Sequence, residues 1–63
     1  MAQGGDPLRT LRHDLSNPLA AILAETQLLL LNVDRFDAET VGSLKQIESL
    51  ARKMRQILQA LDE

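Results

Sequence analysis

The residues of this 63-residue chain that could do chemistry lie in one stretch that begins at its only histidine. Asp14 directly follows His13, and Asn17 comes one helical turn later. A carboxylate can accept one ring N–H of an imidazole and fix its tautomer, which leaves the lone pair of the other ring nitrogen for nucleophilic attack. A lone exposed histidine on a helix is usually a solvated residue without a role. The surrounding elements and residues must therefore decide between the two interpretations.

The composition argues against several classes of site and partner. A chain without cysteine forms neither disulfides nor thiolate metal sites, and one histidine argues against a metal site built by this chain alone. The net charge of -2, with acids and bases interspersed, argues against nucleic-acid binding. No apolar run approaches the roughly 20 residues that cross a bilayer, and we find no signal peptide. We expect no membrane contact by this segment and a cytoplasmic location, whether the parent protein is membrane-anchored or soluble.

Helix-forming residues dominate the chain, and its apolar residues recur at helical spacing. The sequence predicts an all-α fold, an antiparallel two-helix hairpin, because a short connection makes neighbouring helices run in opposite directions. Asp6 and Asp37 are the expected N-caps, with Pro7 at the first helical position. The predicted organisation is a disordered lead-in at 1–5 and one domain at 6–63, with a helix at about 6–32, a loop at about 33–37 and a helix at about 38–62.

Each predicted helix is apolar over a wider arc than one partner helix can cover. The first helix has a seam at Leu15, Ile22 and Leu29, and its run of four leucines places Leu28 and Leu31 outside that seam. A homodimer that forms a four-helix bundle would cover both regions. The alternative is that the leucine run packs on another domain. The expected core positions of the second helix, with the two apolar residues beside them, are Leu44, Ile47, Ala51, Met54, Leu58, Leu61, Leu50 and Ile57.

Helical phase places the histidine on the outer face of the first helix. At about 100° per residue, His13 lies about 200° from Leu15 of the seam. Arg9 and Asn17 are four residues away on either side and share the face of His13. Asp14 lies about 100° to the side, between this face and the seam. The face continues in side chains too small to obstruct a docking partner, at Ala20, Ala21 and Ala24.

Pro18 lies inside the predicted first helix, but the apolar pattern continues past it. A proline has no N–H for the carbonyl of Asp14, and its ring crowds that carbonyl. The apolar pattern resumes directly after Pro18. We therefore predict a kinked, continuous helix and not a helix that ends at this residue.

The stretch His13-Asp14-Leu15-Ser16-Asn17-Pro18-Leu19, followed by Ala20-Ala21-Ile22, resembles the phosphoacceptor box of two-component sensor histidine kinases. That box reads His, Glu or Asp, Leu or Ile, a variable residue, Asn or Thr, Pro and Leu, and every defined position is matched. The resemblance covers nearly the whole chain. It implies the dimerisation and histidine phosphoacceptor (HisKA) domain, a hairpin that carries the box on its first helix and dimerises into a four-helix bundle.

The resemblance implies a role for each residue of the box. His13 would take the γ-phosphoryl group of ATP and pass it to an aspartate of a response regulator receiver domain. Asp14 would act as base and orienter of the imidazole, Asn17 would place water in a phosphatase reaction, and Pro18 would supply a kink below the site. Arg9 is a candidate from helical spacing alone: a cation one turn away could stabilise the phosphorylated imidazole. An ordinary solvated arginine is an equally open interpretation.

The chain departs from the family in lacking the ATP-binding domain, since Gly4-Gly5 is too short for a phosphate-binding loop and follows no strand. We expect no cofactor or metal in this chain, with ATP and Mg²⁺ bound by a separate catalytic domain. The chain would then be a fragment of a protein-histidine kinase that is inactive alone. Its expected partners are a second copy, a receiver domain and that catalytic domain. The alternatives are a stand-alone phosphotransfer protein of a phosphorelay and an inactive structural dimerisation hairpin.

Overall fold

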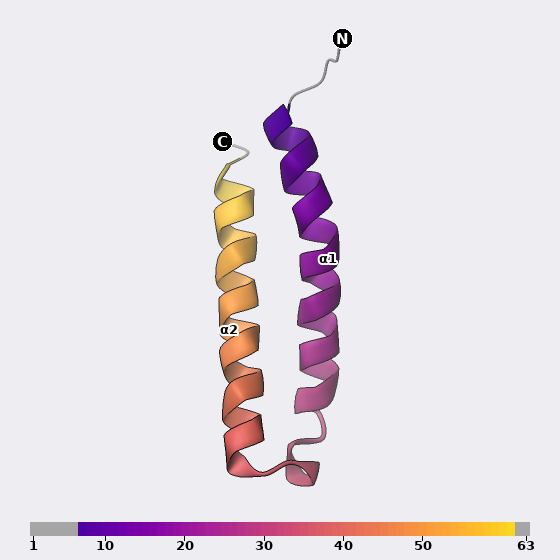
Figure 1. The fold of residues 1–63 in the computed structure, drawn as a ribbon, viewed down its shortest axis with the longest axis vertical. Coiled ribbons are helices and arrows are strands. Elements are labelled where there is room, and N and C mark those ends of the chain that lie inside the picture. Colours follow the sequence, from indigo (N-terminus) through magenta and orange to yellow (C-terminus); the bar gives the residue numbers. More distant parts are fainter. Residues whose placement is uncertain (1–6, 62–63) are drawn as a thin grey trace.

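The computed structural model describes residues 7–61, which form a helical hairpin. Its elements are α1 (Pro7–Leu30), a short 3₁₀ helix η1 (Val33–Arg35) and α2 (Ala38–Ala60). The two long helices lie side by side and run in opposite directions, with η1 at one end of the rod (Figure 1). The predicted all-α hairpin is confirmed. The lead-in expected at 1–5 and the cap expected at Asp6 lie outside the described residues.

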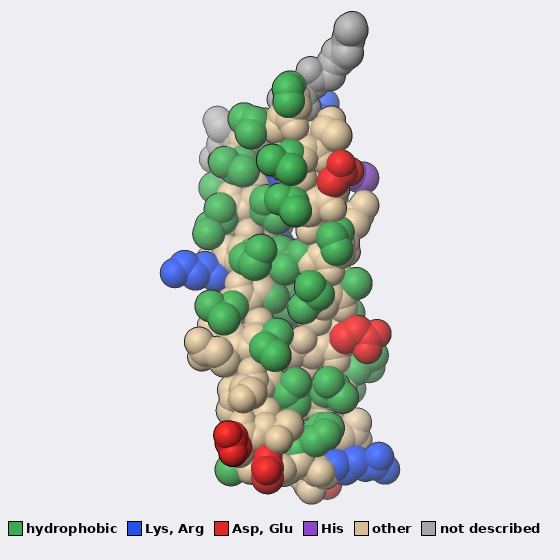
Figure 2. Space-filling model, in the orientation of Figure 1, with side chains coloured by type: hydrophobic (Ala, Val, Ile, Leu, Met, Phe, Trp, Pro, Cys, Tyr) green, Lys and Arg blue, Asp and Glu red, His purple; other side chains and the backbone are tan. Residues whose placement is uncertain are grey.

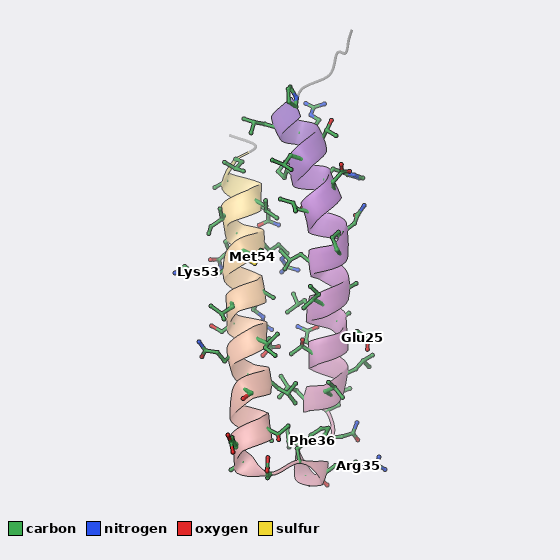
Figure 3. All side chains as sticks on the ribbon, viewed as in Figure 1. Glu25, Arg35, Phe36, Lys53 and Met54 are labelled. Carbon is green, nitrogen blue, oxygen red and sulfur yellow. The ribbon has the colours of Figure 1, made fainter. Side chains whose placement is uncertain are left out.

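The connection between the helices, residues 31–37, contains hydrogen-bonded turns where the sequence predicts a plain loop. The α-helix ends at Leu30, about two residues earlier than expected. The amide of Asn32 donates to the carbonyl of Leu29 at 3.0 Å, an i→i−3 bond that narrows the last turn. The amide of Phe36 then closes η1 on the carbonyl of Val33 at 3.1 Å. Phe36 is half-buried at the base of the hairpin (Figure 3).

Asp37 begins α2 as a side-chain N-cap, as predicted. Its backbone is extended, with φ -73° and ψ 169°, and its carboxylate accepts the amide of Thr40 at 2.8 Å. This bond satisfies one of the N–H groups that the first turn of a helix leaves without a partner. Thr40 also holds the pKa of Asp37 below the ordinary value of 3.8, because its hydrogen bond favours the charged carboxylate.

The contact between α1 and α2 is built by one narrow stripe from each helix. The buried apolar side chains are Leu19, Leu23, Ala51 and Leu58. Thr26 is also buried, and its hydroxyl donates to the carbonyl of Ile22 at 2.7 Å, so the polar group is satisfied.

The seam expected on α1 was the wrong one of two neighbouring stripes. Leu15, Ile22 and Leu29 remain 43–50% exposed, and Met54 of α2 is 50% exposed as well. Both helices carry apolar residues in adjacent pairs, such as Ile22 and Leu23, and only one member of each pair can face the other helix. The second member lies about 100° round the helix and stays at the surface.

These exposed residues form one continuous apolar face over both helices. The hydrophobic side chains run along α1 and α2 for most of the length of the hairpin (Figure 2). We call this surface the apolar face. Its large members, all between 42% and 55% exposed, are Leu8, Leu11, Leu15, Ile22, Leu29, Ile47, Leu50, Met54, Ile57 and Leu61. Within residues 7–61, no helix is both long and apolar enough to cross a membrane.

Candidate functional site

The candidate site lies on the N-terminal half of α1. The helix contains Pro18 in its interior and continues through it, which confirms the expected continuity. The bend expected at Pro18 stays a prediction. Because the helix is unbroken from Pro7 onward, the four-residue spacing of Arg9, His13 and Asn17 places their side chains in one row.

His13 lies at the surface and away from α2, as the sequence predicts. It is exposed, and so are Asp14, Asn17 and Arg9. Asp14 lies about 100° further round α1, so that carboxylate and imidazole are neighbours on adjacent sides of the helix. A shallow depression of about 420 Å³ beside His13 is lined by Arg9, Thr10, Arg12, His13, Asp14 and Ser16. The site is thus an open surface that a large partner can reach, and not an enclosed pocket.

The structure adds two half-buried residues to the site that sequence reasoning missed. Arg12 and Ser16 line the depression beside His13, and both are half-buried. They continue, at spacings of four and three residues, the stripe of Leu19 and Leu23 that faces α2. That spacing was present in the sequence, but it becomes informative only when the stripe that faces α2 is known.

The side of the hairpin opposite the apolar face is polar on α2. Helical phase places Lys45, Ser49, Arg52 and Gln56 on this side. The guanidinium of Arg52 contacts the carboxylate of Glu48 at 3.2 Å, an exposed i,i+4 pair that contributes about 0.3–0.5 kcal/mol. The outer face of α1 and the polar side of α2 therefore leave a hydrophilic surface for transient contacts near His13.

The donor set of the described residues does not suggest a resident metal. Within residues 7–61, no group of three or more His, Cys, Asp and Glu side chains lies close enough together to hold a metal ion. The chemistry that the site offers is that of an exposed imidazole beside a carboxylate and two guanidinium groups. Such an imidazole can act as a nucleophile toward an electrophile carried by another protein.

One comparison with known proteins gives a match. The His Kinase A (phospho-acceptor) domain model matches residues 6–63. No curated protein and no solved structure matches the chain at a significant level. The family match spans both helices and includes the stretch that begins at His13. The chain therefore belongs to the His Kinase A phospho-acceptor domain family.

Proposed function

We propose that this chain is the phosphoacceptor and dimerisation module of a sensor histidine kinase, and that His13 is the phosphorylated residue. The observation that carries the proposal is the exposed position of this single histidine on a hairpin that matches the phospho-acceptor family. An outward imidazole on a rigid helix is accessible to two large partners in turn, the donor and the acceptor of the phosphoryl group. Asp14 beside it supports the nucleophile, because a carboxylate can hold the second ring nitrogen as N–H.

The proposed reaction consists of two displacements at phosphorus. In the first, the lone pair of a His13 ring nitrogen attacks the γ-phosphorus of ATP. The N–P bond forms, the bond to the bridging oxygen breaks and ADP leaves. In the second, a carboxylate oxygen of a receiver aspartate attacks the same phosphorus and the N–P bond breaks, which returns the electron pair to His13. ATP and Mg²⁺ are brought by a separate catalytic domain, and positioning dominates such transfers.

Asn17 has a proposed role in the phosphatase reaction, which removes the phosphoryl group from the receiver. Its amide lies one turn from His13 on the same exposed row. When a receiver is docked on this row, the amide of Asn17 would orient a water molecule toward the phosphorus of the receiver's aspartyl phosphate. Attack by the water oxygen breaks the bond to the aspartate and releases inorganic phosphate. The small exposed side chains of Ala20, Ala21 and Ala24 leave room below His13 for that receiver. We propose a cytoplasmic location for the segment, because the proposed reactions need ATP and a receiver domain.

The apolar face supports the proposed homodimer. Ten large apolar residues on one side of a hairpin exceed what a monomer normally exposes in one patch. A second copy presents the same face, so a two-fold contact buries both faces and completes a four-helix bundle. His13 lies outside this face and stays accessible in such a dimer.

The test is transfer of labelled phosphate to the single histidine. The chain is incubated with ATP labelled in its γ-phosphate and with purified catalytic domains of histidine kinases. We expect an acid-labile, alkali-stable label in the wild type and none in His13→Ala. The matched control is Gln27→Ala, an exposed change nearly three turns beyond the row, which should keep the label. Label that persists in His13→Ala would contradict the proposal.

A further inference from the structure

Arg12 directly precedes His13 but lies on a different side of α1. Two helical turns separate Arg12 from the buried Leu19, so both residues lie on the side of α1 that faces α2. Arg12 is half-buried, whereas Arg9 and His13 are exposed. A partly covered arginine has fewer accessible rotamers than an exposed one, which limits the region that its guanidinium can occupy.

Asp14 and Arg12 flank His13 on opposite sides. Each is one residue away, so each lies about 100° round the helix from His13, in opposite directions. The imidazole therefore has a guanidinium on the side toward α2 and a carboxylate on the side away from it. Both groups line the depression that also contains Arg9 and His13. On α2, Arg55 lies four residues after the buried Ala51, and adds positive charge to the side that faces α1.

The geometry points to Arg12 as a binding residue for the phosphoryl group on His13. The phosphoryl group then lies on the side of the imidazole that faces α2. This inference rests on the proposed function, because it requires that His13 carries a phosphoryl group. A phosphoryl group has up to two negative charges and three acceptor oxygens, which a guanidinium can bind through two parallel N–H groups. The carboxylate of Asp14 repels the phosphoryl group from the other side and remains available to the second ring nitrogen.

The test measures the ionisation of the phosphoryl group itself. Phosphoramidate, a small donor, transfers its phosphoryl group to a ring nitrogen of His13 with loss of ammonia, and the single histidine confines the product to one residue. A ³¹P NMR titration then gives the second pKa of the bound phosphoryl group. A neighbouring cation favours the dianion and lowers this pKa. We expect Arg12→Gln to raise this pKa by about 0.5 unit, the size of one charge pair near the protein surface.

Two further variants separate binding from an indirect effect. Arg12→Lys retains the charge and should restore most of the wild-type pKa. Lys53→Gln removes the same charge from α2, where the side chain points away from α1 (Figure 3), and should leave the pKa unchanged. Equal pKa values in Arg12→Gln and Lys53→Gln would overturn the inference. A raised pKa that Arg12→Lys does not restore would overturn it too, because the effect would then come from altered packing.

This experiment is independent of the enzymatic test. Chemical loading needs no catalytic domain, so it reports on Arg12 even if the labelling by ATP fails. Absence of enzymatic label would count against the proposed function, whereas an unchanged titration in Arg12→Gln would count against the role of Arg12 alone. Far-UV circular dichroism of each variant checks that helix content equals that of the wild type.

Discussion

At the scale of single residues, the carboxylate of Asp37 determines where α2 begins and makes the hairpin sensitive to acid. Hydrogen bonding from Thr40, through its side chain first and its backbone amide second, holds the pKa of Asp37 below 3.8 in the folded chain. A lowered folded pKa means that the unfolded chain binds the proton more readily. The stabilisation is therefore fully present above about pH 3.8 and is lost as pH falls through the lower, folded pKa.

The comparison of wild type with Asp37→Asn isolates this effect. Asparagine is also a good N-cap, but it does not titrate, so the variant should fold while losing the charge. We expect the wild type to have the higher melting temperature at pH 6, because a carboxylate also interacts favourably with the helix dipole. The difference should shrink toward zero as pH falls below about 3.8 and through the lower pKa of the folded chain. A difference that stays constant over this range would contradict the assignment.

The site residues were predictable from sequence to different degrees. Helical phase was enough to place His13 at the surface. Whichever of the two apolar stripes of α1 packs on α2, His13 lies at least about 100° away from it. Arg12 was missed for a physical reason. Its half-burial depends on which stripe packs on α2, and an arginine in sequence shows only that it is charged.

At the scale of the elements, Gly42 is a weak point in α2 that the fold does not require. It lies within the second turn, no φ angle in the described chain is positive, and a Cβ at this position would meet nothing within 4 Å. Gly42→Ala should therefore stabilise the chain by about 1 kcal/mol, because alanine loses less backbone entropy when the helix forms. Urea unfolding at one fixed protein concentration measures the change.

Ala24→Gly serves as the opposite control for Gly42→Ala. Ala24 is an exposed position in the interior of α1, so the reverse change should cost about 1 kcal/mol. If Gly42→Ala destabilised the chain while Ala24→Gly behaved as expected, the outer side of α2 at Gly42 would be in contact with another molecule. The prediction that the position is open would then be wrong.

The two helices and their antiparallel course were predictable, but the face that each helix turns toward the other was not. Periodicity and the cap at Asp37 indicate two helices and a short connection, since both signals are local. Adjacent apolar pairs, such as Leu29 with Leu30 and Ile57 with Leu58, give two stripes with the same spacing. The pattern therefore cannot tell which stripe faces the other helix and which faces a second copy. Packing decides, and it favours the stripe with the small residue Ala51, which lets the helices approach closely.

At the scale of the whole molecule, the hairpin has too little interior to account for its own stability. The Cα trace measures 52 × 16 × 13 Å, and within residues 7–61 only four apolar side chains are buried. Two-helix rods of this kind need a further partner to bury enough apolar surface. The apolar face offers a larger apolar area than the contact between α1 and α2, so folding and association should be coupled. The melting temperature of the wild type should then rise with protein concentration.

A charge in the apolar face should separate the two copies, whereas the same charge on the polar side should not. Met54 lies in the middle of the apolar face on α2, and Gln56 lies two residues on, about 200° round the helix. In the proposed dimer, Met54→Glu would bury a carboxylate without a partner and remove an apolar side chain from the contact, which weakens the dimer at least about tenfold. Gln56→Glu adds the same charge at the exposed polar surface and should leave the dimer intact.

Sedimentation equilibrium at micromolar concentration distinguishes these outcomes. We expect the mass of a dimer for the wild type and Gln56→Glu, and the mass of a monomer for Met54→Glu. The melting temperature of Met54→Glu should also be low and independent of concentration, since a monomer gains nothing from mass action. A monomeric wild type, or equal masses for the two glutamate variants, would show that the apolar face is not the contact between copies. His13 is the chain's only histidine. The proposed phosphoacceptor would then lie on a hairpin whose apolar face is covered by some other partner.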